Sequence, residues 1–131
     1  MTTDNHAYAP ADHIQSVHVD FYRENGFLIA VDLFTADEVQ EIKDETLKIF
    51  RGERGMIEGM QDVTADETDV ATLLRYLCIH FPHKLSDVIH KYLVHPGTAD
   101  VLQKLISPNV KAMQSMLFVK LLIHSLKYQT N

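Results

Sequence analysis

The apolar residues of the chain recur mostly at the three- and four-residue spacing of amphipathic helices. The clearest such segment begins near Thr35, which has the spacing of a capping box with Glu38. Asp37 and Glu38 at its start complement the helix dipole, and Gly52 is suited to end the helix. We therefore predict a helix whose apolar face consists of Val39, Ile42, Thr46, Ile49 and Phe50.

Three further stretches have helical spacing. The first runs from a cap at Asp12 to Asn25, and Gly26 is its natural stop. The second covers residues 85–93, and the third follows a cap at Thr98. The apolar faces are Ile14, Val17, Phe21 and Tyr22 in the first, Leu85, Val88, Ile89, Tyr92 and Leu93 in the second, and Val101, Leu102, Leu105 and Ile106 in the third.

Strand signals are fewer. Residues 27–31 ("FLIAV") are short, apolar and typical of a buried strand, whereas residues 110–119 are apolar on both faces and predict a strand covered on both sides. Residues 70–81 fit a helix or a strand, and residues 52–69, rich in glycine and acidic groups, predict a surface loop. Two strands do not form a stable sheet alone. The pattern therefore predicts an α+β fold with many helices and few strands, forming the front part of something larger.

Composition narrows the class of protein. The 131 residues suffice for one domain, and 46% hydrophobic with 23% charged residues is ordinary for a globular protein. A net charge of −6 without a basic cluster argues against a nucleic-acid partner. The single cysteine, Cys78, fits a reducing compartment, and we interpret it as a buried small hydrophobe. Since no apolar run is long enough for a bilayer and the start is no signal peptide, we predict a cytoplasmic protein without a membrane partner.

Several residues have the spacing of metal-binding or catalytic motifs, but the surrounding sequence does not provide the geometry or the further residues that such motifs require. His18 and Asp20 form a His-x-Asp pair, but residues two apart in a helix point to different faces. His80 and His83 flank Pro82, which disrupts helical geometry, and no cysteine or carboxylate completes a zinc spacing. The chain has no Gly-x-Ser-x-Gly elbow and no phosphate-binding glycine loop. We therefore assign no catalytic residue and no metal ligand in this chain.

Three stretches, in their order and spacing, resemble the phytanoyl-CoA dioxygenase family. They are "FYRENGFLIAVDLFTADEVQEI", "IHFPHKLSDVIHKYLVHPGTADVLQKLISPNV" and "MQSMLFVK", and the resemblance runs from about residue 17 to Lys120. It implies an Fe(II)- and 2-oxoglutarate-dependent oxygenase. Its fold would be a double-stranded β-helix (jelly roll), of which this chain is the helix-rich N-terminal part with few strands. Such enzymes hold iron with two histidines and one carboxylate.

In that family, the strand resembling "QSMLFVK" leads to a Pro/Gly-rich loop, the His-x-Asp iron motif, a distal His and an Arg for 2-oxoglutarate. Here Lys120 is followed by "LLIHSLKYQTN", where none of these has a counterpart. Two cosubstrate positions of the family do have counterparts, Lys84 in "PHKLSDVI" and Met116 in "QSMLFVK". The resemblance implies that Lys84 pairs with a 2-oxoglutarate carboxylate and that Met116 lines its apolar side.

We therefore predict a flexible leader at residues 1–11, the N-terminal part of a phytanoyl-CoA dioxygenase-like domain at 12–120, and a divergent tail at 121–131. Such a tail is typical of a splice form, a frameshift or a gene-model error. The polypeptide is predicted to be inactive and to bind neither Fe(II) nor 2-oxoglutarate usefully. The alternative is a non-catalytic interaction protein, whose 110–119 strand pairs with a second copy or with a full-length relative. A further alternative is failure to fold, since ordering costs about 1–2 kcal/mol per residue.

Overall fold

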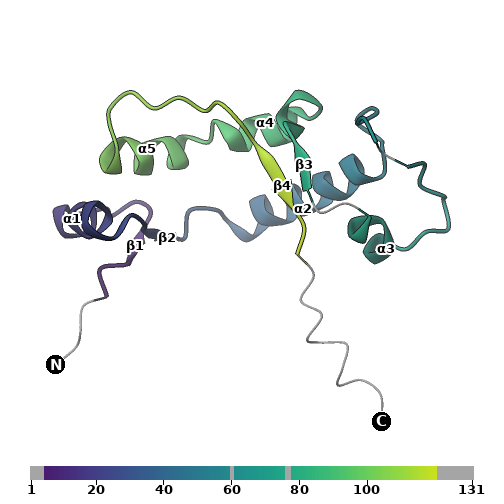
Figure 1. The fold of residues 1–131 in the computed structure, drawn as a ribbon. Helices are drawn as coiled ribbons and strands as arrows, with labels where there is room; N and C mark the ends of the chain where they lie inside the picture. The colour runs from purple at the N-terminus through teal and green to yellow at the C-terminus, as the bar shows by residue number, and fades with distance from the viewer. Residues whose placement is uncertain (1–4, 60, 76–77, 121–131) are drawn as a thin grey trace, which may run out of the picture. The chain divides into compact units, whose positions relative to one another are not determined.

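The computed structural model describes residues 5–59, 61–75 and 78–120 (Figure 1). These residues form helices with a few short strands, so the α+β prediction is confirmed at this level. Among the described residues, no helix combines the length and apolar character needed to cross a bilayer. The chain divides into two compact units, which are Met1–Gln40 with Lys91–Met113 and Glu41–His90 with Gln114–Asn131.

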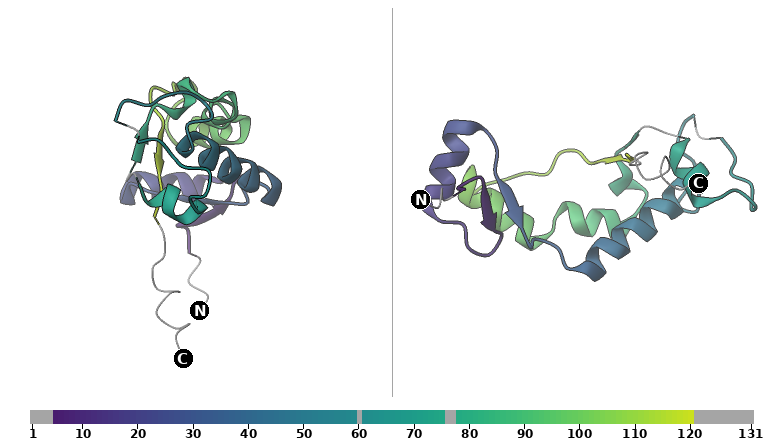
Figure 2. Two further views of the ribbon diagram at one scale, coloured as in Figure 1. Left: turned by 90° about the vertical axis from the view of Figure 1, so that its right-hand side faces the viewer. Right: turned by 90° about the horizontal axis from the view of Figure 1, so that it is seen from below.

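In the first unit two strands pair in parallel, β1 (Tyr8–Pro10) and β2 (Ile29–Val31), joined by helix α1 (Ser16–Asn25). Figure 2 shows the two strands side by side, as Figure 1 does. Strand β1 lies within the stretch predicted as a leader. Ala7 and Ala9 are buried there, because this short segment pairs with β2. The local sequence pattern gives no signal of this strand.

Helix α1 begins later than predicted. Its N-cap is Gln15 rather than Asp12, and the Gln15 N–H donates to Nδ1 of His18 at 3.0 Å. The predicted stop is confirmed, since Gly26 has φ +80° and its N–H donates to the Tyr22 carbonyl at 2.8 Å. Only glycine adopts this left-handed conformation without cost.

Helix α2 (Ala36–Phe50) has the predicted capping box. The Glu38 N–H donates to Oγ1 of Thr35 at 3.2 Å, and the Thr35 N–H donates to Oε2 of Glu38 at 2.8 Å. This reciprocal arrangement satisfies two backbone donors that the first turn of a helix leaves open.

Helix α5 (Pro96–Leu105) does not begin at the predicted cap, Thr98. Its N-cap is His95, and Pro96 occupies the first helical position, where a missing N–H costs nothing. The His95 ring stacks on Tyr92, with 6.1 Å between ring centroids. The helix contacts α1 within the first unit.

The second unit contains a small core. The sequence of residues 70–81 fits either a helix or a strand. In the structure it contributes to one of each, a helix that ends at Leu74 and a strand that begins at Cys78. The core residues are Ile49, Phe50, Ile79 and Ile89. After α2, this unit contains α3 (Asp69–Leu74), β3 (Cys78–His80), the 3₁₀ turn η1 (Pro82–Lys84), α4 (Asp87–Leu93, whose last three residues belong to the first unit) and β4 (Met116–Phe118).

Some predicted elements and faces are corrected. The strand expected at 110–119 is confined to β4, because only these three residues find a partner strand among the described residues. Likewise, the strand expected at 27–31 forms only at Ile29–Val31. Val39 and Ile106, assigned to helix inner faces, are 38% and 59% exposed, because each lies at an end of its apolar stripe.

Candidate functional site

The antiparallel ladder of β3 and β4 organises the candidate site (Figure 1). Its residue pairs are Cys78 with Phe118, Ile79 with Leu117 and His80 with Met116. The ladder continues by one pair, because the Phe81 N–H donates to the Ser115 carbonyl at 2.9 Å. Hydrogen-bonded and non-hydrogen-bonded pairs alternate along an antiparallel ladder, so His80 and Met116 form a non-hydrogen-bonded pair with closely spaced side chains.

The ladder has one buried face and one open face. Ile79 is 3% exposed, and Leu117 packs against the same core. Met116 and Phe118 alternate with Leu117 and are 42% and 62% exposed. The sequence predicted cover on both sides of this strand, but the described residues cover only one. An apolar face with two large side chains is therefore open in this part of the chain.

A strained turn follows β3. Phe81 has φ +56°, a left-handed conformation that is costly for a bulky residue. The turn is fastened to the residue before β4: the His83 N–H donates to Oγ of Ser115 at 3.4 Å, and Nδ1 of His83 lies 2.6 Å from the same oxygen. Together with the Phe81–Ser115 backbone bond, these contacts hold the turn against the start of β4.

Lys84 and Met116, the two residues suggested for 2-oxoglutarate, lie at the same end of this ladder. Lys84 closes the turn, where its N–H donates to the Phe81 carbonyl at 3.0 Å and its ammonium lies 4.8 Å from the Phe81 ring centroid. Met116 directly follows Ser115, to which the turn is fastened. Within the described residues, no carboxylate is paired with the Lys84 ammonium, which is exposed.

The other spacings noted in the sequence have local structural roles. His18 receives the hydrogen bond that begins α1, while Asp20 lies 3.8 Å from Arg23 on the same helix. Cys78 is half-buried rather than buried, because it faces the open side of the ladder, where its Sγ lies 3.7 Å from Nε2 of His80. In the described ranges, no three His, Cys, Asp or Glu side chains come together in a way that could hold a metal ion.

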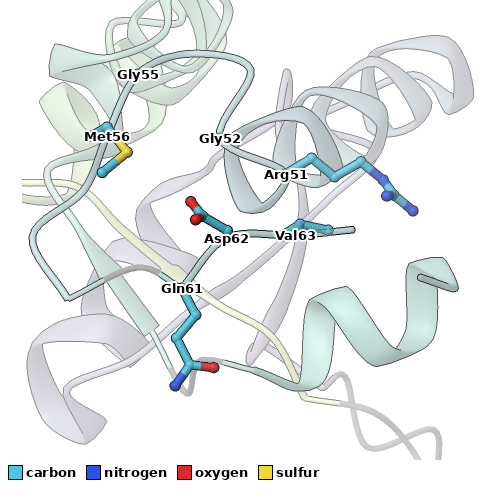
Figure 3. Close-up of a pocket in the computed structure, with 7 residues that line it drawn as sticks. All are labelled: Arg51, Gly52, Gly55, Met56, Gln61, Asp62 and Val63. Carbon is cyan, nitrogen blue, oxygen red and sulfur yellow. The ribbon is translucent and has the colours of Figure 1, made fainter. Parts of the chain in front are cut away.

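A pocket of about 290 Å³ lies on the loop that follows α2, but its charges do not converge (Figure 3). The Arg51 side chain points away from Asp62. Its guanidinium instead donates to Oδ1 of Asp69 at 2.6 Å and to the Glu67 carbonyl at 3.0 Å. The lining residues are Arg51, Gly52, Gly55, Met56, Gln61, Asp62 and Val63. We assign no function to this pocket.

The second unit also contains a buried carboxylate that the sequence analysis missed. Glu45 is 3% exposed, accepts two hydrogen bonds from Arg54 at 2.6 and 2.9 Å, and accepts one from Ser86 at 2.7 Å. The Arg54 bonds lower the pKa of Glu45 from 4.5 to about 2; burial opposes this effect and the Ser86 hydroxyl adds to it. Its signal in the sequence is a charge placed between Ile42 and Ile49, on the apolar face of α2. Both carboxylate oxygens accept hydrogen bonds from within the unit, so we interpret this group as structural.

Comparison with protein-family models, with curated proteins and with solved structures found no match for this chain. The motifs in the sequence and the geometry of the β3–β4 end are therefore the basis of the function proposed below.

Proposed function

We propose that the chain is the N-terminal part of a phytanoyl-CoA dioxygenase-like domain, and that the turn after β3 and the start of β4 form its 2-oxoglutarate end. The observation that supports this most is the ladder register. It brings Lys84 and Met116, which lie far apart in the sequence, to one end of one ladder. Both match cosubstrate positions of the family pattern in the sequence. We also propose that the complete domain has the jelly-roll fold of that family.

The residues at this end fit a dicarboxylate better than they fit iron. The exposed Lys84 ammonium is a point charge that can pair with a carboxylate, and the Met116 thioether, at the same end of the ladder, can supply an apolar contact. Iron requires three convergent donors, and the part of the chain that the structure describes offers no such group. Enzymes of the family couple hydroxylation of a carbon to decarboxylation of 2-oxoglutarate. We derive no step of that reaction through this polypeptide.

The purified 131-residue polypeptide is therefore expected to form no succinate from 2-oxoglutarate. The physical reason is the missing set of iron ligands, since the sole His-x-Asp of the sequence is used in α1. The measurement is succinate formation with Fe(II), ascorbate and 2-oxoglutarate, beside an active oxygenase of the family in the same buffer. Succinate formed in proportion to this polypeptide would contradict the expectation.

The open face of the ladder favours a second candidate function, a non-catalytic interaction protein. Met116 and Phe118 are exposed side by side, and β4 pairs with β3 alone among the described strands. A strand with a free edge and an apolar face recruits further strands, either from a second copy or from a full-length relative.

Under this second function, the chain is expected to self-associate as its concentration rises. Replacing Phe118 by lysine places a charge on the open face and should shift the chain toward monomer, as measured by size-exclusion chromatography at several concentrations. Met113→Lys is the matched control, because Met113 is 81% exposed and lies outside the strand. A wild-type chain that stays monomeric at every concentration would argue against edge pairing.

A further inference from the structure

The contacts of Ser115 favour one of the two tautomers of a neutral His83 ring. The Ser115 hydroxyl accepts the His83 backbone N–H at 3.4 Å and also lies 2.6 Å from Nδ1 of the same residue. If Nδ1 carried the proton, the hydroxyl would accept twice and its own O–H would need another acceptor. The described residues supply none. If Nδ1 is unprotonated, the Ser115 hydroxyl donates to it. Every polar group in this His83–Ser115 contact then has a partner.

With Nδ1 accepting from Ser115, the proton of a neutral His83 ring resides on Nε2. This nitrogen has no hydrogen-bond partner among the described residues, and the side chain is half-buried. Nε2 is therefore available as a donor to a ligand.

His83 and Lys84 contact the same aromatic ring. The His83 ring meets the Phe81 ring edge-on, with 6.1 Å between centroids, and the Lys84 ammonium lies over it at 4.8 Å. The strained turn thus holds an imidazole and an ammonium around one apolar surface. Both groups contact the same Phe81 side chain, and an N–H donor together with an ammonium is a pair that suits a carboxylate.

We propose that Ser115 is a positioning residue that fixes His83 as the Nε2–H tautomer, and that this N–H and the Lys84 ammonium together bind one carboxylate of a dicarboxylate ligand. The inference rests on the proposed function, because it assigns a further contact to the same 2-oxoglutarate end. It adds His83 and Ser115 to a site that the sequence analysis limited to Lys84 and Met116.

The test uses the whole ¹⁵N-labelled chain at about pH 8. Long-range ¹H–¹⁵N spectra of the histidine rings report the tautomer directly, and a His83→Asn variant assigns the signal. We expect His83 to be the Nε2–H tautomer, to become a mixture in Ser115→Ala, and to return to Nε2–H in Ser115→Thr, which restores a hydroxyl. A wild-type His83 protonated on Nδ1 would overturn the inference.

The second readout is a titration with 2-oxoglutarate, beside acetate as a plain carboxylate. We expect 2-oxoglutarate to bind this chain only weakly, but to shift Nε2 of His83 and Nζ of Lys84 together. Lys84→Met should weaken that affinity by about two- to fivefold, as is typical of an exposed ion pair. Equal binding of acetate would support the carboxylate contact but count against the proposed cosubstrate. If no carboxylate moves the His83 signal, the inference fails, even where Lys84 responds.

Discussion

Replacing Phe50 by alanine is expected to remove most of the stability of the second unit. Phe50 is completely buried, and its neighbours in the core are Ile49, Ile79 and Ile89. Removing a buried phenylalanine side chain costs about 3–5 kcal/mol, through lost burial and the cavity left behind. Domains are stable by only about 5–15 kcal/mol, and a core this small belongs at the low end of that range.

Urea unfolding followed by circular dichroism measures this effect as a change in the free energy of unfolding. Phe118→Ala is the matched control, because it removes the same side chain from a position that is 62% exposed, and it should change stability by less than about 0.5 kcal/mol. Equal effects of the two substitutions would mean that Phe50 does not occupy the core.

Replacing Glu45 by glutamine is expected to produce the second-largest loss, and one that depends on pH. The carboxylate is buried and its pKa is lowered from 4.5 to about 2, chiefly by the hydrogen bonds from Arg54. A lowered carboxyl pKa stabilises the folded state above the unfolded value, and this stabilisation is lost as the pH falls through the folded value. Since Arg54 is 37% exposed and partly screened, we expect a loss on the order of 2 kcal/mol at neutral pH.

The difference in unfolding free energy between wild type and Glu45→Gln should therefore narrow as the pH falls from about 4.5 toward about 2. Urea melts at several pH values in that window measure it. The control is Glu58→Gln, which removes an exposed carboxylate from the same unit and should leave the pH dependence unchanged. A constant difference across the window would show that the carboxylate does not carry the stabilisation.

The sequence predicts the elements whose signals are local. The capping box at Thr35 and the stop at Gly26 are each encoded within a few residues, so both are found where predicted. Strand β1 is not predictable in this way, because three residues ending in a proline become a strand only through pairing with β2. The same applies to Glu45, whose burial depends on Arg54 and Ser86, residues that come together only in the fold.

In the candidate site, too, the sequence predicts what is encoded locally and not what depends on long-range contacts. The family pattern suggests Lys84 and Met116, but it does not show what places them at the same end of one ladder. Their shared position depends on a cross-strand register and on the contact between His83 and Ser115, both of which are long-range. A histidine and a serine without a motif give no local signal, so the sequence analysis assigned neither to the site.

The most direct test of the account is the pattern of nuclear Overhauser effects between β3 and β4 in the labelled chain. The register observed here makes His80–Met116 and Cys78–Phe118 the non-hydrogen-bonded pairs, so contacts between their Hα atoms are predicted. A register shifted by one residue would turn Met116 toward the core and separate it from the Lys84 turn. Contacts between Hα atoms of that shifted register, or none between these strands, would contradict the proposed site.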